Sequence, residues 1–238
     1  MSLYRERGVV LRTHKLGEAD RIITFMTRGR GKVRAVAKGV RKTKSRFGGR
    51  LEPPSHVDLQ LYEGRELDIV TQVETLDHFG GLREEYERLA RAVAMLEATD
   101  QIALEREANP QLYKMLVGAL RALADRDTPL VVPAFFLKVL ALEGFRPQVD
   151  ECAVCGAENG LVSWAIEEDG LRCSAHRQGA PIGPEAVGML QRILGGQLGD
   201  ALNEPVSPHT TELDQLATKA LEHHLERRLR SIATLHRS

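Results

Sequence analysis

The sequence has few cysteines and no long apolar segment, and both absences restrict what the chain can be. Its 238 residues include only three cysteines, an odd and small number that argues against a disulfide-stapled extracellular protein. The longest apolar stretch, residues 130–137, is interrupted by Pro133 and is much shorter than the roughly 18 residues that a membrane helix needs. The first residues are charged and lack the apolar core of a secretory signal. We therefore expect a cytoplasmic protein that does not enter a membrane.

The sequence also lacks the motifs of common nucleotide-dependent and hydrolytic enzymes. Gly31-Lys32 has Met26 at the position where a phosphate-binding loop carries its first glycine, and no serine-hydrolase or zinc-protease motif is present. The upstream His-x-Glu pair that a zinc deaminase needs is missing as well. We therefore predict that the protein is not an enzyme.

Charge is distributed unevenly along a chain whose total charge is zero. Residues 1–50 carry 15 Lys and Arg against 3 Asp and Glu, a net charge of +12, so residues 51–238 carry −12. Between residues 28 and 50 there are ten bases and no acid. An uninterrupted positive stretch of this size indicates a polyanionic partner, for which nucleic acid is the usual choice. A solvated charged surface without a partner is the alternative.

The first 78 residues show the alternation of apolar and polar residues that is typical of half-buried strands. Five such segments lie at residues 9–11, 22–26, 33–37, 57–61 and 67–73, the last with Leu67, Ile69, Thr71 and Val73 on one face. Glycine-containing turns at residues 28–31 and 63–64 join neighbouring segments. Five antiparallel strands of this length predict a small barrel of OB type. An SH3-like barrel would show much the same pattern.

After residue 80 the apolar residues recur with the period of amphipathic helices. We expect helices from residue 82 toward 104, after Pro110, from about Pro133 to Gly144, from Pro184 to the glycines at 195–196, and from Ser207-Pro208 to Ile232. The predicted fold is therefore of the α+β class. Its predicted parts are an OB-fold nucleic-acid-binding domain at residues 1–80, a helical domain at 81–150 and 178–238, and a zinc ribbon inserted at 151–177.

All three cysteines fall in one motif together with a histidine. Cys152 and Cys155 form a C-x2-C pair, and after seventeen intervening residues Cys173 and His176 form a C-x2-H pair. Two such turns joined by a hairpin, whose turn lies at residues 168–170, direct four side chains to one point, as tetrahedral zinc requires. Three thiolates and one imidazole leave no open coordination position, so the motif predicts a structural zinc rather than a catalytic one. Small buried thiols beside an unrelated histidine are the alternative.

Several segments in order resemble the bacterial RecO family of recombination mediators. They are residues 8–11, 17–23, 31–32, 37–42 with Ser45, and 51–53, followed by the helical part and the cysteine pairs. The resemblance implies an N-terminal OB barrel, a helical domain and, in many members, an inserted zinc ribbon. The family usually has a cysteine as the fourth metal ligand, where this chain has His176, and zinc accepts either residue.

The resemblance also implies a function in DNA repair. It implies binding of single- and double-stranded DNA, annealing of complementary strands, and cooperation with RecR in loading RecA onto DNA covered by single-strand binding protein (SSB). The helical domain of the family contacts the acidic C-terminal tail of SSB. We expect such a protein to be associated with the nucleoid. An RNA-binding protein with the same barrel and ribbon, a metal-dependent enzyme with an open zinc position, and a pure scaffold are the alternatives.

The predicted DNA contacts lie on the third strand and in the connection that follows it. We expect phosphate contacts from six bases, Arg34, Lys38, Arg41, Lys42, Lys44 and Arg46. Phe47, within the same basic connection, is either a base-stacking residue or a plug of the barrel. Because phosphate contacts do not read sequence, binding should have little sequence preference and a steep dependence on salt.

Overall fold

The computed structural model describes residues 2–126, 128–168 and 170–232, which form two units. The first, here called the barrel unit, consists of residues up to 126 together with residues 230–232 near the C-terminus. The second, here called the knuckle unit, consists of residues 128–229 apart from the gap at 169. The four-part division drawn from sequence character stays a prediction, because the two units group elements by their contacts.

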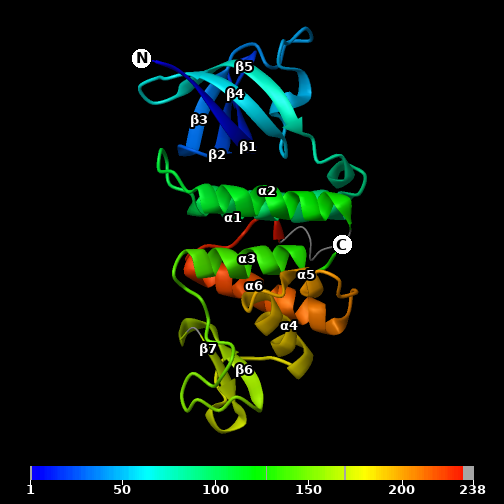
Figure 1. The fold of residues 1–238 in the computed structure, drawn as a ribbon. Coiled ribbons are helices and arrows are strands. Elements are labelled where there is room, and N and C mark those ends of the chain that lie inside the picture. Colours follow the sequence, from blue (N-terminus) through cyan, green and yellow to red (C-terminus); the bar gives the residue numbers. More distant parts are fainter. Residues whose placement is uncertain (1, 127, 169, 233–238) are drawn as a thin grey trace. The chain divides into compact units, whose positions relative to one another are not determined.

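Five strands of the barrel unit form a closed barrel (Figure 1). The strands are β1 (Leu3–Leu16), β2 (Asp20–Thr27), β3 (Gly31–Ala37), β4 (His56–Tyr62) and β5 (Asp68–Asp77). Their order around the barrel is β1-β2-β3-β5-β4, β4 pairs back to β1, and β3 meets β5 in a short parallel pairing at Ala35 and Asp68. The predicted OB-type barrel is confirmed.

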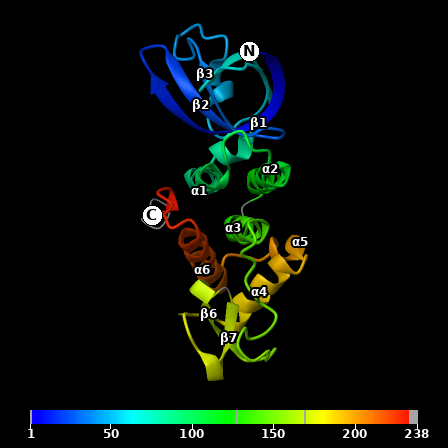
Figure 2. The same ribbon diagram turned by 90° about the vertical axis from the view of Figure 1, so that its left-hand side faces the viewer.

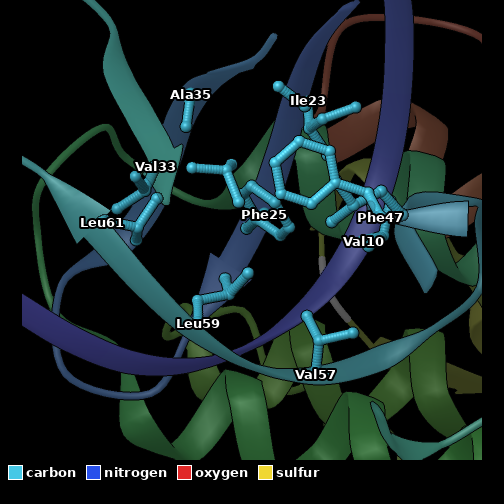
Figure 3. Packing of buried hydrophobic residues seen from close by; sticks show 12 residues of the cluster. Val10, Ile23, Phe25, Val33, Ala35, Phe47, Val57, Leu59 and Leu61 are labelled. Atoms are coloured by element: carbon cyan, nitrogen blue, oxygen red, sulfur yellow. The ribbon is translucent and has the colours of Figure 1, made fainter. Parts of the chain in front are cut away.

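The barrel is filled by inward-facing apolar side chains, including Phe25, Val33 and Leu59 (Figure 3). The predicted inward face of β5 is wrong at its start, because Val70, not Ile69, is fully buried there. The register against β4 shifts between Gln60 and Leu61. Such a bulge adds one residue to one strand and exchanges its two faces.

Two helices, α1 (Tyr86–Ile102) and α2 (Pro110–Asp125), complete the barrel unit and run side by side, as their end-on view in Figure 2 shows. Residues 103–109 connect them and lie against β3, where Lys32 N–H donates to Leu104 O at 3.1 Å and Arg106 N–H donates to Lys32 O at 3.0 Å. Gly31 has to be glycine, since a Cβ there would lie 1.7 Å from Glu107 O. The α1–α2 connection therefore acts as an extra short strand on the barrel.

The knuckle unit contains helices and one small sheet. The helices are α3 (Val131–Leu142), α4 (Pro184–Leu194), the four-residue α5 (Leu198–Ala201) and α6 (Pro208–His224). Between α3 and α4 lies a sheet of order β7-β6-β8, with β6 (Leu161–Ala165), β7 (Gly170–Cys173) and β8 (Ala180–Pro181). Ser207 caps α6 as predicted, with its hydroxyl accepting from Thr210 N–H. None of the described helices is long and apolar enough to cross a membrane.

The last helix is shorter than its apolar stripe predicts. It ends at His224, and Glu226 then adopts a left-handed backbone with φ of 50°. Residues 230 and 231 instead join the barrel unit, where the Glu97 carboxylate on α1 accepts the Arg230 and Ser231 N–H groups at 3.0 and 2.9 Å. Residues 233–238 of the predicted last domain and Asp169 of the predicted hairpin turn lie outside the described residues.

Candidate nucleic-acid interface and metal site

Several basic residues on the strands of the barrel are paired with acids. Lys32 Nζ lies 3.6 Å from an Asp100 carboxylate oxygen, and Arg12 Nε donates to the other oxygen of the same carboxylate. Arg34 lies 3.6 Å from Glu105. Asp100 comes from α1 and Glu105 from the α1–α2 connection. Of the six bases predicted to contact phosphate, Arg34 therefore differs from the others. It lies on β3, and the Glu105 carboxylate partly neutralises its charge.

The same connection pairs with Lys32 on β3, and strands 2 and 3 with the first and fourth loops form the face that OB folds commonly use for oligonucleotides. Arg106 donates to Asp68 at 2.9 Å, and the Asp68 side chain is completely buried at the start of β5. The Tyr4 hydroxyl also donates to Asp68, and burial followed by the Asp68 contact raises the pKa of this tyrosine. These contacts fasten the connection to the barrel at the start of β3 and of β5.

Residues 38–50, here called the basic loop, carry six bases and no acid. Lys38, Lys42, Lys44 and Arg46 are exposed, and among the described residues no ion pair is formed by them. Arg41 donates to the carbonyl oxygens of Gly17 and Glu18, which leaves its charge unneutralised. Five of the six predicted basic contacts thus lie together in one loop and, within the described part of the chain, form no ion pair, although the Asp20 carboxylate accepts from Gly39 N–H at 2.7 Å.

Phe47 is not available for base stacking in this structure, so that prediction is wrong and the alternative of a barrel plug is the correct one. Its side chain is 1 % exposed and belongs to the barrel core. Figure 3 shows the ring pointing into the barrel beside Val10 and Ile23. Phe47 is the largest apolar residue of a mostly polar loop, and burying it fastens that loop to the barrel.

Two further basic residues that the sequence analysis missed, His78 and Arg83, line a pocket together with the basic loop. They follow β5 and flank the turn that contains Gly80-Gly81. Basic residues on both sides of a Gly-Gly turn at a strand end are a weak signal, because the sequence does not reveal which loop the turn packs against.

The four predicted metal ligands come together in the knuckle unit. The ligand atoms of Cys152, Cys155, Cys173 and His176 all lie within 4.8 Å of one another. Cys155 and Cys173 have their sulfur atoms 3.8 Å apart, and His176 Nδ1 lies 3.4 Å from Cys173 Sγ and 3.9 Å from Cys152 Sγ. The cluster is able to hold a metal ion.

The three separations of 3.4–3.9 Å are close to those around one tetrahedral ion. Zinc bound at the usual distances to sulfur and nitrogen places neighbouring donors about 3.5–3.8 Å apart. We call each turn between two paired ligands a knuckle, the first at residues 152–155 and the second at 173–176. In the first knuckle, Gly156 N–H donates to Cys152 O at 2.9 Å, and Gly156 adopts φ of 71°. The amide of Cys173 and those of Val154 and Cys155 donate to the Cys152 sulfur and lower the pKa of its thiol to about 6. The backbone therefore stabilises a thiolate before any metal binds.

Comparisons with known proteins agree over the whole chain. Residues 1–79 match the family model described as Recombination protein O N terminal, and residues 83–233 match Recombination protein O C terminal. A DNA repair protein RecO of Thermobifida fusca is 42 % identical over 244 residues and covers 100 % of both chains. A DNA repair protein RecO of a Nocardioides species is 46 % identical over 244 residues, covering 99 % of this chain and 100 % of its own.

Proposed function

The chain belongs to the RecO family of DNA repair proteins, and from that membership we propose that it is a recombination mediator. In this role it binds single- and double-stranded DNA, anneals complementary strands, and helps RecR to load RecA onto DNA covered by SSB. It acts by binding and releasing its partners rather than by catalysing a reaction. Its place of action is the nucleoid, where these partners meet.

The observation that carries the DNA-binding part of this proposal is the uncompensated charge of the basic loop. Six bases without an acid repel one another, and the fold keeps them close by burying Phe47 and Leu51 in the barrel. The repulsion is relieved when phosphates replace the surrounding counterions. Arg12, Lys32 and Arg34 on the strands lack this unrelieved repulsion, because Asp100 and Glu105 already oppose them.

Phosphate contacts from Lys38, Arg41, Lys42, Lys44 and Arg46 would give affinity without sequence preference. Arg34 joins them only when it exchanges the Glu105 carboxylate for a phosphate. Each phosphate that is neutralised on a single strand contributes about −0.7 to the slope of log K against log salt. We expect the affinity to fall steeply with salt.

Annealing follows from the same electrostatics. Two complementary strands repel each other through their phosphates, and that repulsion slows their encounter. A loop with six cations neutralises part of both backbones at once. Because it contacts phosphates and not base edges, the bases stay free to pair.

The metal proposed for the knuckle unit is zinc, held by Cys152, Cys155, Cys173 and His176. Three thiolates and one imidazole suit zinc better than magnesium or calcium, which prefer oxygen. With four protein ligands the ion has no open position, so when bound it supplies folding energy and no chemistry. The SSB tail and RecR are proposed as protein partners on the basis of family membership.

Charge reversal in the basic loop tests the proposal. Replacing Arg41, Lys42 and Lys44 by Glu changes the loop charge by six units, and we expect DNA binding to be lost in about 0.1 M salt. The melting temperature should stay nearly unchanged, because the three side chains are exposed. A matched control replaces Lys219, Arg227 and Arg228, three exposed bases of the knuckle unit, by Glu.

The two variants carry the same net charge, so their difference isolates the position of the charge. Equal binding by both would contradict the proposed interface. Preferential displacement of labelled single-stranded DNA by RNA of the same length would favour the RNA-binding alternative. Faster pairing of SSB-coated complementary strands by the wild type, and not by the loop variant, is the expected functional result.

A further inference from the structure

An open pocket of about 530 Å³ lies between the end of the basic loop and the turn after β5. Its charged lining consists of Arg46 and Arg50 from the loop and of His78 and Arg83 from the turn. No carboxylate contributes to the lining. Two chain segments that are distant in sequence therefore bring three guanidinium groups and one imidazole to the same hollow.

The loop side of this pocket is held in place by its own contacts. The Arg46 guanidinium lies over the buried Phe47 ring, 4.8 Å from the ring centre. Arg50 donates to the carbonyl oxygens of Arg46 and Phe47 at 3.1 and 3.4 Å. Neither contact neutralises a guanidinium, so both arginines are positioned and still fully charged.

The opposite side is fastened by buried anchors that alternate with the exposed bases. Phe79 is 2 % exposed and stacks on the buried ring of His56, with centroids 6.4 Å apart. Leu82 is completely buried and donates its N–H to Phe79 O at 2.9 Å. His78 and Arg83, next to these anchors in the chain, are directed outward by the same turn.

Asp77 and Glu85, which flank this turn, are engaged with other groups, whereas Glu84, next to Arg83, is exposed and does not line the pocket. Asp77 accepts from Phe79 N–H at 2.9 Å and from Arg121 at 3.1 Å. Glu85 pairs with Arg88 at 3.3 Å. Among the described residues, Arg46, Arg50, His78 and Arg83 form no ion pair. The pocket therefore presents positive charge that an anion can neutralise without displacing a protein carboxylate.

We infer that this pocket binds a phosphate group of the nucleic acid, as a second contact point beyond the exposed part of the basic loop. The inference rests on the proposed function, because it names a further subsite for the same ligand. Guanidinium groups bind phosphate oxygens in pairs, and the bases on both sides of the pocket give a phosphate partners from two directions. A strand that crosses the basic loop and reaches the pocket is held at two places on the barrel unit.

The test compares Arg83→Gln and His78→Gln with Arg5→Gln, which removes one exposed arginine from β1. With single-stranded DNA of about 20 nucleotides, longer than one OB fold usually covers, we expect Arg83→Gln to weaken binding about fivefold. The slope of log K against log salt should fall by about 0.7, as one lost phosphate contact predicts. His78→Gln should act in the same direction with a smaller effect, and Arg5→Gln should match the wild type.

Oligonucleotides with and without a 5′-phosphate distinguish the two sources of the phosphate. An equal loss for both indicates an internal phosphodiester, and a loss confined to the phosphorylated strand indicates a terminal phosphate. Either result supports the pocket. If both pocket variants bind DNA like Arg5→Gln while the triple loop variant does not bind, the inference that the pocket binds phosphate is wrong and the proposed function stands. If the triple loop variant binds like the wild type, the proposed function itself fails.

Discussion

The basic loop and the turns between the paired metal ligands are both exposed, but they are held in place by different means. The loop is fastened by Phe47 and Leu51, which are 1 % exposed and lie in the core of a closed barrel. In the two knuckles, the residues between the paired ligands are exposed, and Val154 is 57 % exposed. The loop depends on apolar burial, whereas the knuckles have little apolar surface to bury.

This difference shows what each segment needs in order to function. A loop that binds a polyanion has to keep its cations free, and two apolar anchors fix its C-terminal end without using any charge. A segment with few buried side chains cannot offset the loss of chain entropy by packing, so it requires a cross-link such as a metal. Unfolding around the basic loop and unfolding around the metal ligands can be measured separately, because the two segments lie near different fluorescent residues. All four tyrosines lie in the barrel unit, and the only tryptophan, Trp164, lies on β6.

Loss of the metal should have the largest effect. Structural zinc contributes about 10–16 kcal/mol of apparent binding free energy in small zinc-finger peptides, which exceeds what the exposed knuckles gain from packing. We expect Cys155→Ser, or a strong chelator, to unfold the segment around Trp164 and to leave the barrel unit folded. Tryptophan emission should shift to longer wavelength under conditions where the tyrosine signal stays native.

A matched pair of substitutions at the fourth ligand isolates the metal from the side chain itself. His176→Cys keeps a zinc donor and should retain one metal ion per chain, whereas His176→Ala should lose it. Metal analysis of the purified proteins measures both outcomes. Retention of the metal by His176→Ala would show that the four residues do not form the site.

Removal of the loop anchor should have the next largest effect. Phe47→Ala takes a buried ring out of the barrel core and should cost about 3–5 kcal/mol of unfolding free energy. Denaturant unfolding followed by tyrosine emission measures this loss. DNA binding should weaken as well, even where the protein is still folded, because the basic loop is no longer fastened to the barrel by the Phe47 ring.

Phe25→Ala provides the control for that variant. Phe25 is also completely buried in the barrel but lies on β2, outside the basic loop. We expect a similar loss of stability and unchanged DNA affinity of the folded protein. If both variants bind DNA like the wild type, the loop does not depend on Phe47 for its function.

The sequence predicted the parts of the fold that are encoded locally. Strand alternation located the barrel, and the cysteine spacing located the ligand cluster, because both patterns are set by neighbouring residues. Whether each basic side chain pairs with an acid could not be predicted in this way. Arg34 and Lys42 are equivalent in the sequence, and only the packing of a connection about 70 residues later gives Arg34 an acidic neighbour. Composition also could not tell that the aromatic residue of a basic loop would point inward.

The smallest expected effect concerns Glu105, the acid that pairs with Arg34 on β3. The Arg34–Glu105 pair is partly exposed on both sides, so Glu105→Gln should change stability by less than about 1 kcal/mol. It also frees Arg34 for a phosphate, and we expect about two- to threefold tighter DNA binding at low salt that disappears at high salt. Glu107→Gln, in the same connection, removes the same charge from a residue that, within the described part of the chain, forms no ion pair. A greater gain for Glu105→Gln than for Glu107→Gln would identify Arg34 as a DNA contact, whereas equal gains would leave only a general electrostatic effect.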